Sequence, residues 1–184
     1  ALSLVGSEMC IRDRFQGQAT TGSAFLVATR PAGLHYDYDV SSTLFAGFYN
    51  LEHSLSASTR LVHSLRAEIL SYDYTNNHLV GNTKDDGTAC GFGGCLYTRP
   101  ASRKDDFTNL GARFGVERDT QMGLVYATVS SGFRPPQVTE LYRLRGGQTI
   151  ADLDSERLSA LEVGIRNNML AVAAFAENTR NFLF

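Results

Sequence analysis

The sequence predicts an all-β protein, an antiparallel up-and-down meander that forms about seven strands of a larger, partial transmembrane β-barrel. Three observations predict this fold class. Apolar and polar residues alternate with a period of two through most of the chain. The connections between the predicted strands alternate between long and short. Charged residues of several strands share one face of the predicted sheet, and apolar residues occupy the other.

The composition is compatible with a barrel and excludes some alternatives. The chain has 184 residues and a net charge of −2, so it lacks the basic footprint of a nucleic-acid partner. Its longest apolar run lies near Met169 to Ala176. A helix that spans a membrane needs about 20 apolar residues, and this run is far shorter. A barrel strand alternates lipid-facing and lumen-facing residues, so an ordinary overall hydrophobicity of 43% does not exclude a membrane.

The first thirteen residues differ from the rest of the chain. They show neither strand alternation nor a helical stripe, and Glu8 interrupts an apolar stretch that no basic region precedes, so they are not a signal peptide. They resemble an adaptor-derived stretch found at the ends of translated environmental reads. We therefore expect residues 1–13, with Cys10, to be non-native and residues 14–184 to be a fragment of a barrel domain whose ends are accidents of sampling. The alternative is a native strand or loop.

The alternation is clearest in the second half of the chain. Leu110, Phe114 and Val116 share one face of a strand whose other face carries Arg113 and Glu117. The same pattern continues in the two following runs and in the run before residue 74. The predicted strands span 14–28, 38–51, 55–74, 106–118, 121–132, 156–166 and 169–184.

The connections predict which side of a membrane each strand end faces. Long loops are expected at 29–37, 75–105 and 133–155. Short turns are expected near Glu52–Ser54, Asp119–Thr120 and Asn167–Asn168. Antiparallel strands place every second connection on the same side, so the long loops share one side and the short turns the other. This asymmetry is typical of bacterial outer-membrane barrels, whereas a soluble β-sandwich has no reason to sort its loops in this way.

One face of the predicted sheet carries charges that a dry core would not accept. Burying unpaired charges in a sandwich core would cost several kcal/mol each, whereas a wide barrel offers them a wet lumen. The alternative is the exposed face of a soluble sheet. The predicted lumen-facing charges are Arg66, Glu68, Arg113, Glu117, Glu162 and Arg166.

Four tyrosines lie at corresponding ends of two predicted strands. A hairpin with its turn near His53 would bring Tyr36, Tyr38, Tyr72 and Tyr74 to one level, as in an interfacial aromatic girdle. The alternative is the ordinary β-propensity of tyrosine.

Two of the three cysteines, Cys90 and Cys95, flank a glycine-rich stretch. A short disulfide, two free thiols and a metal site all remain open. The metal site has the weakest support because no histidine is near, and no metal site or cofactor is predicted.

The segment from Tyr126 to Asn168 carries an ordered series of short motifs. A strand ends in Gly132, Phe133, Arg134 and Pro136, and a Leu141–Tyr142 pair follows Glu140. The next strand opens near Glu156 and carries Glu162, Gly164 and Arg166. This combination resembles the C-terminal barrel of TonB-dependent receptors, and the resemblance covers roughly residues 14–184. In that family a short turn of helix carries the Leu–Tyr pair, so the resemblance implies a short helix there. Pro135 departs from the family pattern, in which a small residue is usual.

The resemblance implies active import across a bacterial outer membrane. Such receptors have barrels of about 22 strands filled by an N-terminal plug. They take up iron–siderophore complexes, cobalamin, haem or carbohydrates with energy from the inner-membrane TonB complex. The implied partners are outer-membrane lipid, TonB through a plug that is missing from this sequence, and a small-molecule ligand such as a metal chelate. Family ligands bind the extracellular loops, where Arg134, Tyr142, Arg143 and Arg145 are candidate contacts to an anionic chelate. The alternative for each is a solvated loop residue.

Three other classes compete with this interpretation. The first is another outer-membrane barrel, such as a porin-like channel. The second is a soluble β-rich binding module. The third is an enzyme, against which the sequence offers no nucleophile elbow, HExxH or phosphate-binding loop. The acidic pairs Asp85–Asp86 and Asp105–Asp106 are interpreted as solvated loop residues.

Overall fold

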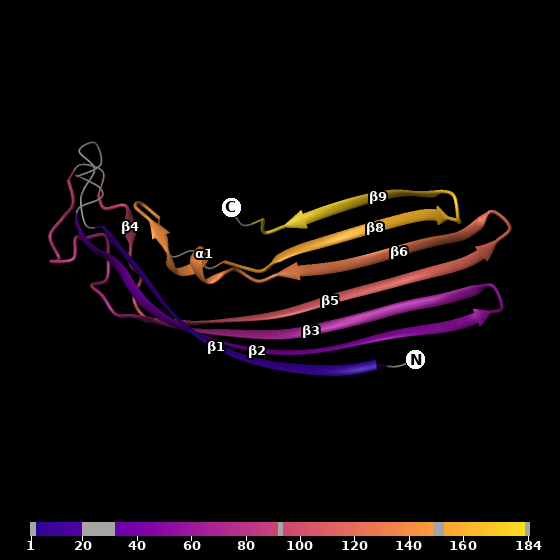
Figure 1. Cartoon of the computed structure of the whole chain (residues 1–184), viewed down its shortest axis with the longest axis horizontal. Coiled ribbons are helices and arrows are strands. Elements are labelled where there is room, and N and C mark those ends of the chain that lie inside the picture. Colours follow the sequence, from indigo (N-terminus) through magenta and orange to yellow (C-terminus); the bar gives the residue numbers. More distant parts are fainter. Residues whose placement is uncertain (1–2, 20–31, 92–93, 149–152, 183–184) are drawn as a thin grey trace.

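The computed structural model describes residues 3–19, 32–91, 94–148 and 153–182, and its main body is one open, antiparallel sheet of seven long strands (Figure 1). The strands lie in the order β1-β2-β3-β5-β6-β8-β9, so neighbours in the sequence are neighbours in space. The predicted meander and partial barrel are therefore confirmed. The main strands are β1 (Ser3–Ala19), β2 (Gly33–Ser56), β3 (Thr59–Asn76), β5 (Arg103–Thr120), β6 (Gly123–Arg134), β8 (Glu156–Arg166) and β9 (Ala171–Arg180).

All short turns lie at one end of this sheet, called the turn end, and the long connections gather at the other, called the loop end (Figure 1). The loop end holds the helix α1 (Val138–Tyr142) and a two-stranded sheet of β4 (Tyr97–Thr98) and β7 (Leu144–Arg145). The predicted sorting of the loops is thus present in the structure.

The first hairpin turn lies further along the chain than predicted. The sequence placed it near Glu52–Ser54, but β2 continues to Ser56 and the turn is formed by Ala57 and Ser58. Glu52 instead pairs opposite Val62 and contacts Arg60 in a 3.4 Å ion pair. A polar run was misinterpreted as a turn because strand positions near a barrel rim are also polar.

The second and third turns shift for a different reason. The predicted turn at Asp119–Thr120 is wrong, because both residues belong to β5 and the turn is Gln121–Met122. Gly123, with φ of +132°, decides this position, since a side chain there would meet the Arg166 carbonyl oxygen. At the third turn, Asn167 accepts backbone hydrogen bonds from Met169 and Leu170, so the turn extends to residue 170.

The ends of several strands also differ from the prediction. Strand β2 begins at Gly33, inside the loop expected at 29–37, and β3 and β5 extend into the loop expected at 75–105. The first strand begins at Ser3 rather than at residue 14, and its predicted part at 20–28 lies outside the described residues. The last strand ends at Arg180, and residues 183–184 are also outside the described residues.

The pairing register defines two faces of the sheet. We call the face that carries Arg66 and Arg113 the inner face, and the face that carries Ile69 and Phe114 the outer face. Arg66 pairs with Gly111 and Ile69 with Thr108, so the faces continue from strand to strand. Strand alternation then assigns every other residue of the sheet.

The apolar core lies on the inner face, at the loop end. It consists of buried residues from β2, β3, β5 and α1: Tyr38, Val40, Leu70, Tyr74, Phe107, Leu141 and Tyr142. The expected aromatic girdle is therefore wrong. Tyr38, Tyr72 and Tyr74 fall on the inner face, and the rings of Tyr38 and Tyr74 lie 5.1 Å apart. Periodicity separates the two faces of a strand but does not say which one faces lipid.

The sheet divides between β5 and β6. Their ladder runs from the turn to the pair Ala112–Ser131 and ends there, while β6 remains paired with β8 up to Arg134. Towards the loop end the two strands diverge, and α1 lies beside the divergence (Figure 1). This arrangement carries the segment after β6 onto the inner face.

Candidate functional site

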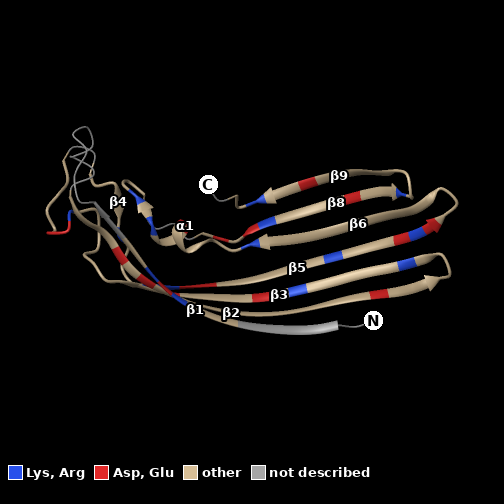
Figure 2. Ribbon diagram, in the orientation of Figure 1, with Lys and Arg blue, Asp and Glu red and all other residues tan. Residues whose placement is uncertain are grey.

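The inner face of the sheet between the turn end and the core carries the charges singled out from the sequence. Arg66 and Glu68 lie opposite Gly111 and Asn109, and Arg113 and Glu117 follow on the same face of β5. Through the pairs Arg113–Ser130 and Thr128–Glu162, this face continues onto β8, where Arg166 follows Glu162. Figure 2 shows these charges spread along the strands. Apolar residues occupy the opposite face.

Ion pairs join several of these side chains. Arg66 contacts Glu68 at 2.6 Å, and the Glu68 side chain is only 8% exposed. Arg60 contacts Glu117 at 2.9 Å across the β3–β5 ladder and also reaches Glu52. Arg60 was not among the predicted site residues, although its place on the alternating charged face was the available signal. Lateral pairing of this kind keeps charges compensated on a sheet surface.

Tyr126 explains why glycine occupies position 164. The two residues are direct cross-strand partners, and a Cβ on Gly164 would lie 2.6 Å from the Tyr126 ring. With the ring across the glycine, the Tyr126 hydroxyl donates a 2.5 Å hydrogen bond to the Glu162 carboxylate. The space above Gly164 is therefore used by a neighbouring strand.

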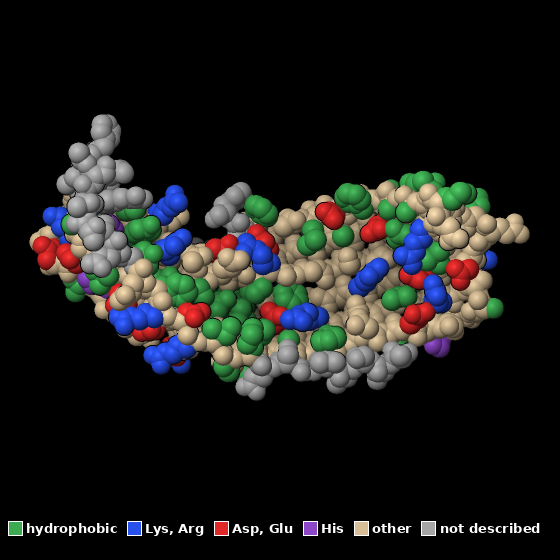
Figure 3. All heavy atoms as spheres, viewed as in Figure 1, with side chains coloured by type: hydrophobic (Ala, Val, Ile, Leu, Met, Phe, Trp, Pro, Cys, Tyr) green, Lys and Arg blue, Asp and Glu red, His purple; other side chains and the backbone are tan. Residues whose placement is uncertain are grey.

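The inner face is hollowed beside these groups. A concave depression of about 700 Å³ has a floor of β3, β5 and β6 and carries both signs of charge. The space-filling view shows charged side chains on this side of the sheet, with hydrophobic groups gathered closer to the loop end (Figure 3). The residues that line the depression include Phe48, Arg66, Glu68, Arg113, Phe133 and Arg134.

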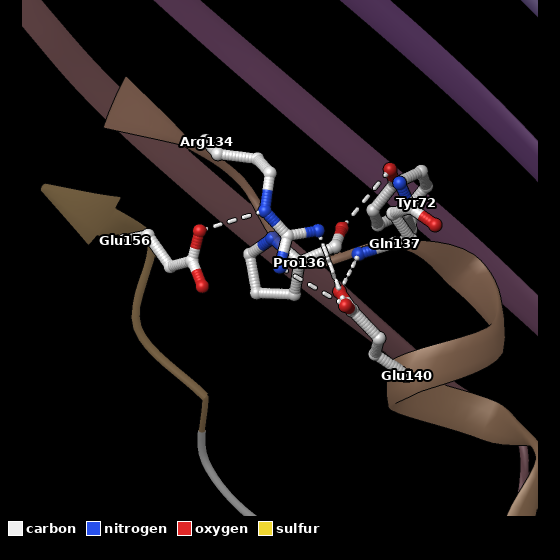
Figure 4. Close-up of polar contacts among 6 residues, drawn as sticks. All are labelled: Tyr72, Arg134, Pro136, Gln137, Glu140 and Glu156. Carbon is white, nitrogen blue, oxygen red and sulfur yellow. Dashed lines mark hydrogen bonds and ion pairs between the residues drawn. The ribbon is translucent and has the colours of Figure 1, made fainter. Parts of the chain in front are cut away.

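Arg134 links the end of β6 to the two elements that follow it (Figure 4). Its Nε donates to Glu156, the first residue of β8, at 2.8 Å, and its terminal nitrogens donate to Glu140 of α1 at 3.1 Å. Glu140 in turn accepts the backbone N–H of Gln137 at 2.7 Å, as part of a capping box. One guanidinium thus holds both ends of the connection between β6 and β8.

Tyr142, at the end of α1, anchors this connection to the sheet. Its ring stacks on Tyr74 with centroids 4.3 Å apart, and its hydroxyl donates to Asp105 at 2.7 Å. It is 2% exposed, and burial, together with the bond to Asp105, raises the pKa of the phenol. A five-residue helix is not stable alone, so this packing supports it.

The comparison with protein families adds the decisive observation. A family model described as TonB dependent receptor-like, beta-barrel matches residues 11–184. The chain belongs to the TonB-dependent receptor β-barrel family. Receptors of this family are outer-membrane transporters of bacteria that take small-molecule ligands and work with TonB. No curated protein matches the chain.

The motifs that resembled TonB-dependent receptors have structural roles in this barrel. Pro136 is buried, and its carbonyl oxygen accepts the Tyr72 hydroxyl at 3.3 Å, so the proline pair carries the chain from the wall onto the inner face. The short helix expected around the Leu141–Tyr142 pair is α1.

The four candidate ligand contacts divide into two pairs. Arg134 and Tyr142 are engaged within the protein, in the ion pairs and ring stacking described above. Arg143 and Arg145 are exposed at the end of α1 and in β7. Leu144 and Arg145 pair with β4, which joins the two long connections of this TonB-dependent receptor barrel. Ligand binding by any of the four stays a prediction.

The connection between β3 and β5 is organised by residues that the sequence did not single out. Asn82 Nδ2 donates to the carbonyl oxygens of Cys95 and Tyr97, and its Oδ1 accepts from the Cys95 N–H. Buried Arg99 donates to the carbonyl oxygens of His35 and Thr83. No periodic signal marks such loop residues. Cys90 and Cys95 form a disulfide, one of the three states left open by the sequence.

Within the described residues, no group of three or more His, Cys, Asp or Glu residues is arranged to hold a metal ion. Over the same part of the chain, no helix is long and apolar enough to cross a membrane.

Proposed function

We propose that the chain is part of an outer-membrane active transporter that imports a scarce nutrient, such as an iron–siderophore chelate, with energy supplied through TonB. The family gives the general activity. The ligand and the contact with TonB, through a plug domain, are the finer parts of the proposal.

The observation that carries the proposal is the division of the sheet into a charged and an apolar face. Phe114 is 52% exposed on the outer face, and Val129 is 57% exposed on the same face. In an outer-membrane barrel, the apolar face would contact hydrocarbon and the charged face would contact a water-filled lumen, so each face has a favourable environment. Arg113 and Glu162, among the inner charges, would then line the path beside the plug.

Exposed arginines at the loop end support the proposal of an anionic ligand. Arg143 and Arg145 are exposed there, beyond the aromatic core. Planar guanidinium groups bind carboxylates and related oxygen donors in a bidentate manner. Arg134 and Tyr142 are proposed as positioning residues that fix α1, and hence the backbone that carries the two exposed arginines.

Uptake by a complete receptor that contains this barrel tests the proposal. We expect iron-labelled chelates to accumulate in cells that express the receptor and TonB, and not in matched cells without TonB. Combining Arg143→Gln with Arg145→Gln should raise the chelate concentration for half-maximal uptake about tenfold, as expected for a loss of about 1.4 kcal/mol. Arg118→Gln, an exposed arginine at the turn end, is the matched control.

The possible outcomes separate the alternatives. Accumulation that does not require TonB would indicate a passive channel. TonB-dependent uptake of a neutral sugar, with no chelate transported, would retain active import and reject the proposed ligand class.

A further inference from the structure

We propose that the outer boundary of the membrane hydrocarbon crosses the sheet at the level of Phe45, Ile69 and Leu110, so that the loop-end parts of β2, β3 and β5 stand outside lipid. This inference rests on the proposed membrane location and adds where the bilayer ends on this barrel. The partner of the outer face below that level is the hydrocarbon of the bilayer.

Beyond the Thr59–Arg118 pair at the turn end, the outer face is mainly apolar up to this level, with His63 as an exception on β3. On β3 its apolar positions run from Leu61 to Ile69, about nine residues, which matches the about 9–11 residues of a tilted transmembrane strand. The last apolar positions on the outer face of their strands are Phe45, Ile69 and Leu110, and each is about half exposed. The lower apolar positions with large exposed side chains include Phe114, Val116, Val125, Val129, Leu161, Val163 and Val172.

Above this level the same face becomes polar. On β3 it carries Asp73 and Thr75, and on β5 it carries Lys104 and Asp106. Lys104 contacts Asp73 at 2.9 Å across the ladder. A charged side chain on the lipid face of a barrel costs about 2–4 kcal/mol at the midplane and almost nothing at the interface. The change in residue type therefore marks the end of the hydrocarbon.

The inner face changes in the opposite sense at the same height. Glu68 and Arg66 are the last charged pair on the inner face of β3, and Leu70 begins the buried aromatic core. Ile69 and Leu70 are neighbours, with 51% and 8% exposure on opposite faces. Below the level the outer face is thus mainly apolar, and above it the inner face holds the aromatic core beside the Arg103–Asp105 ion pair. This arrangement is expected if water reaches the outer face only in the upper half.

The β5–β6 ladder ends close to this level. Its last pair is Ala112–Ser131, two residues from Leu110. An open strand edge is excluded from hydrocarbon because its backbone groups would lack hydrogen-bond partners, but it is tolerated in water. The division between β5 and β6 therefore begins where lipid is proposed to end, which is an argument independent of side-chain polarity.

Nitroxide labels on the complete receptor in lipid nanodiscs test the boundary. Single cysteines are introduced as Ile69→Cys and Thr75→Cys on β3, and as Leu110→Cys and Asp106→Cys on β5, in a background whose other free cysteines are replaced by serine and whose Cys90–Cys95 disulfide is kept. Thr75 and Asp106 are exposed, so their replacement should not disturb folding. We expect collisions with dissolved oxygen to dominate at positions 69 and 110. A water-soluble nickel chelate should dominate at 75 and 106, which reverses the sign of the logarithmic collision ratio. Asp73→Cys is a further variant above the boundary.

The controls separate failure of the inference from failure of the proposed function. Phe114→Cys should report lipid wherever the boundary lies. If Phe114 reports lipid while 69 and 110 report water, or if 73, 75 and 106 report lipid, the boundary is misplaced and the transporter proposal stands. If Phe114 also reports water, the outer face does not contact lipid and the membrane proposal itself fails.

Discussion

At the scale of single residues, Gly164 and Tyr126 show how one cross-strand pair organises the charged inner face. The glycine leaves space for the phenol ring, and the ring directs its hydroxyl to Glu162. Large residues packed over a glycine partner are a known way to fix the register of strands. The pair therefore couples local packing to the arrangement of the lumen side.

Replacing Gly164 with alanine should destabilise the barrel by about 1–2 kcal/mol, because the ring must move and its hydrogen bond to Glu162 is lost. The matched control is Gly132→Ala on β6, where an added Cβ would meet no atom of the described residues within 4 Å. Urea unfolding of the complete receptor in detergent, followed by heat-dependent gel mobility, measures the difference. Equal midpoints for the two variants would contradict this account of the pair.

Several of these residue roles could be predicted from the sequence only in part. Alternation placed Glu162 and Arg166 on one face, and the structure places them together. It did not identify Tyr126 as the occupant of the space above Gly164, because cross-strand partners depend on the register and the turn length. Asn82 and Arg99 bind backbone carbonyl groups within a loop, an interaction that leaves no periodic signal.

At the scale of elements, α1 is a five-residue helix that depends on its surroundings. Arg134 holds its first turn through Glu140, and Tyr142 holds its end against Tyr74 and Asp105. The sequence predicted this helix through its resemblance to the family. It did not predict that Tyr142 would be buried, because a tyrosine after a short helix is compatible with both a packing and a binding role.

Tyr142→Ala should release α1, since removing a buried aromatic ring costs about 3–5 kcal/mol. Tyr142→Phe keeps the stacking on Tyr74 and loses only the hydrogen bond to Asp105, about 1 kcal/mol. Amide hydrogen exchange of Val138–Tyr142 in the complete receptor distinguishes them, with much faster exchange expected for alanine than for phenylalanine. Slow exchange in the alanine variant would show that the helix does not depend on this ring.

The strands themselves were predicted well in number and order, and less well at their ends. Alternation identifies a strand wherever the two faces differ in polarity. At the loop end, the outer faces of the strands carry polar residues, as loops do. The sequence therefore predicted β2, β3 and β5 too short. At the turn end, the backbone requirement of Gly123 outweighed the polar Asp119–Thr120 pair.

At the scale of the whole molecule, the first strand raises the question of where the native barrel begins. Met9 and Ile11 pair with Leu44 and Ser42 on the inner face, and Arg12 pairs with Ser41 on the outer face. Through Leu44, Met9 lies in register with the core residues Leu70 and Phe107, so its apolar side chain matches those of its neighbours at this level. The family match begins at residue 11. That residues 1–13 are adaptor-derived stays a prediction, and sequencing the intact gene across this point tests it.

The whole sheet is organised by the opposite environments of its two faces. Neighbouring residues of one strand are expected to meet water and hydrocarbon in turn over the lower half of the barrel. In the upper half, β2, β3 and β5 have a polar outer face and contribute to an aromatic inner core. Both halves follow from the side-chain alternation of strands and from the position of the bilayer.

The most direct test of this organisation compares two adjacent residues, Arg113 and Phe114, in the complete receptor in outer-membrane vesicles. Each is replaced by cysteine in a background whose other free cysteines are replaced by serine, and is exposed to a membrane-impermeant maleimide after the vesicles are opened. The account predicts rapid labelling of Arg113→Cys from the aqueous lumen and protection of Phe114→Cys within lipid. Equal labelling of the two positions, or labelling of Phe114→Cys alone, would contradict it.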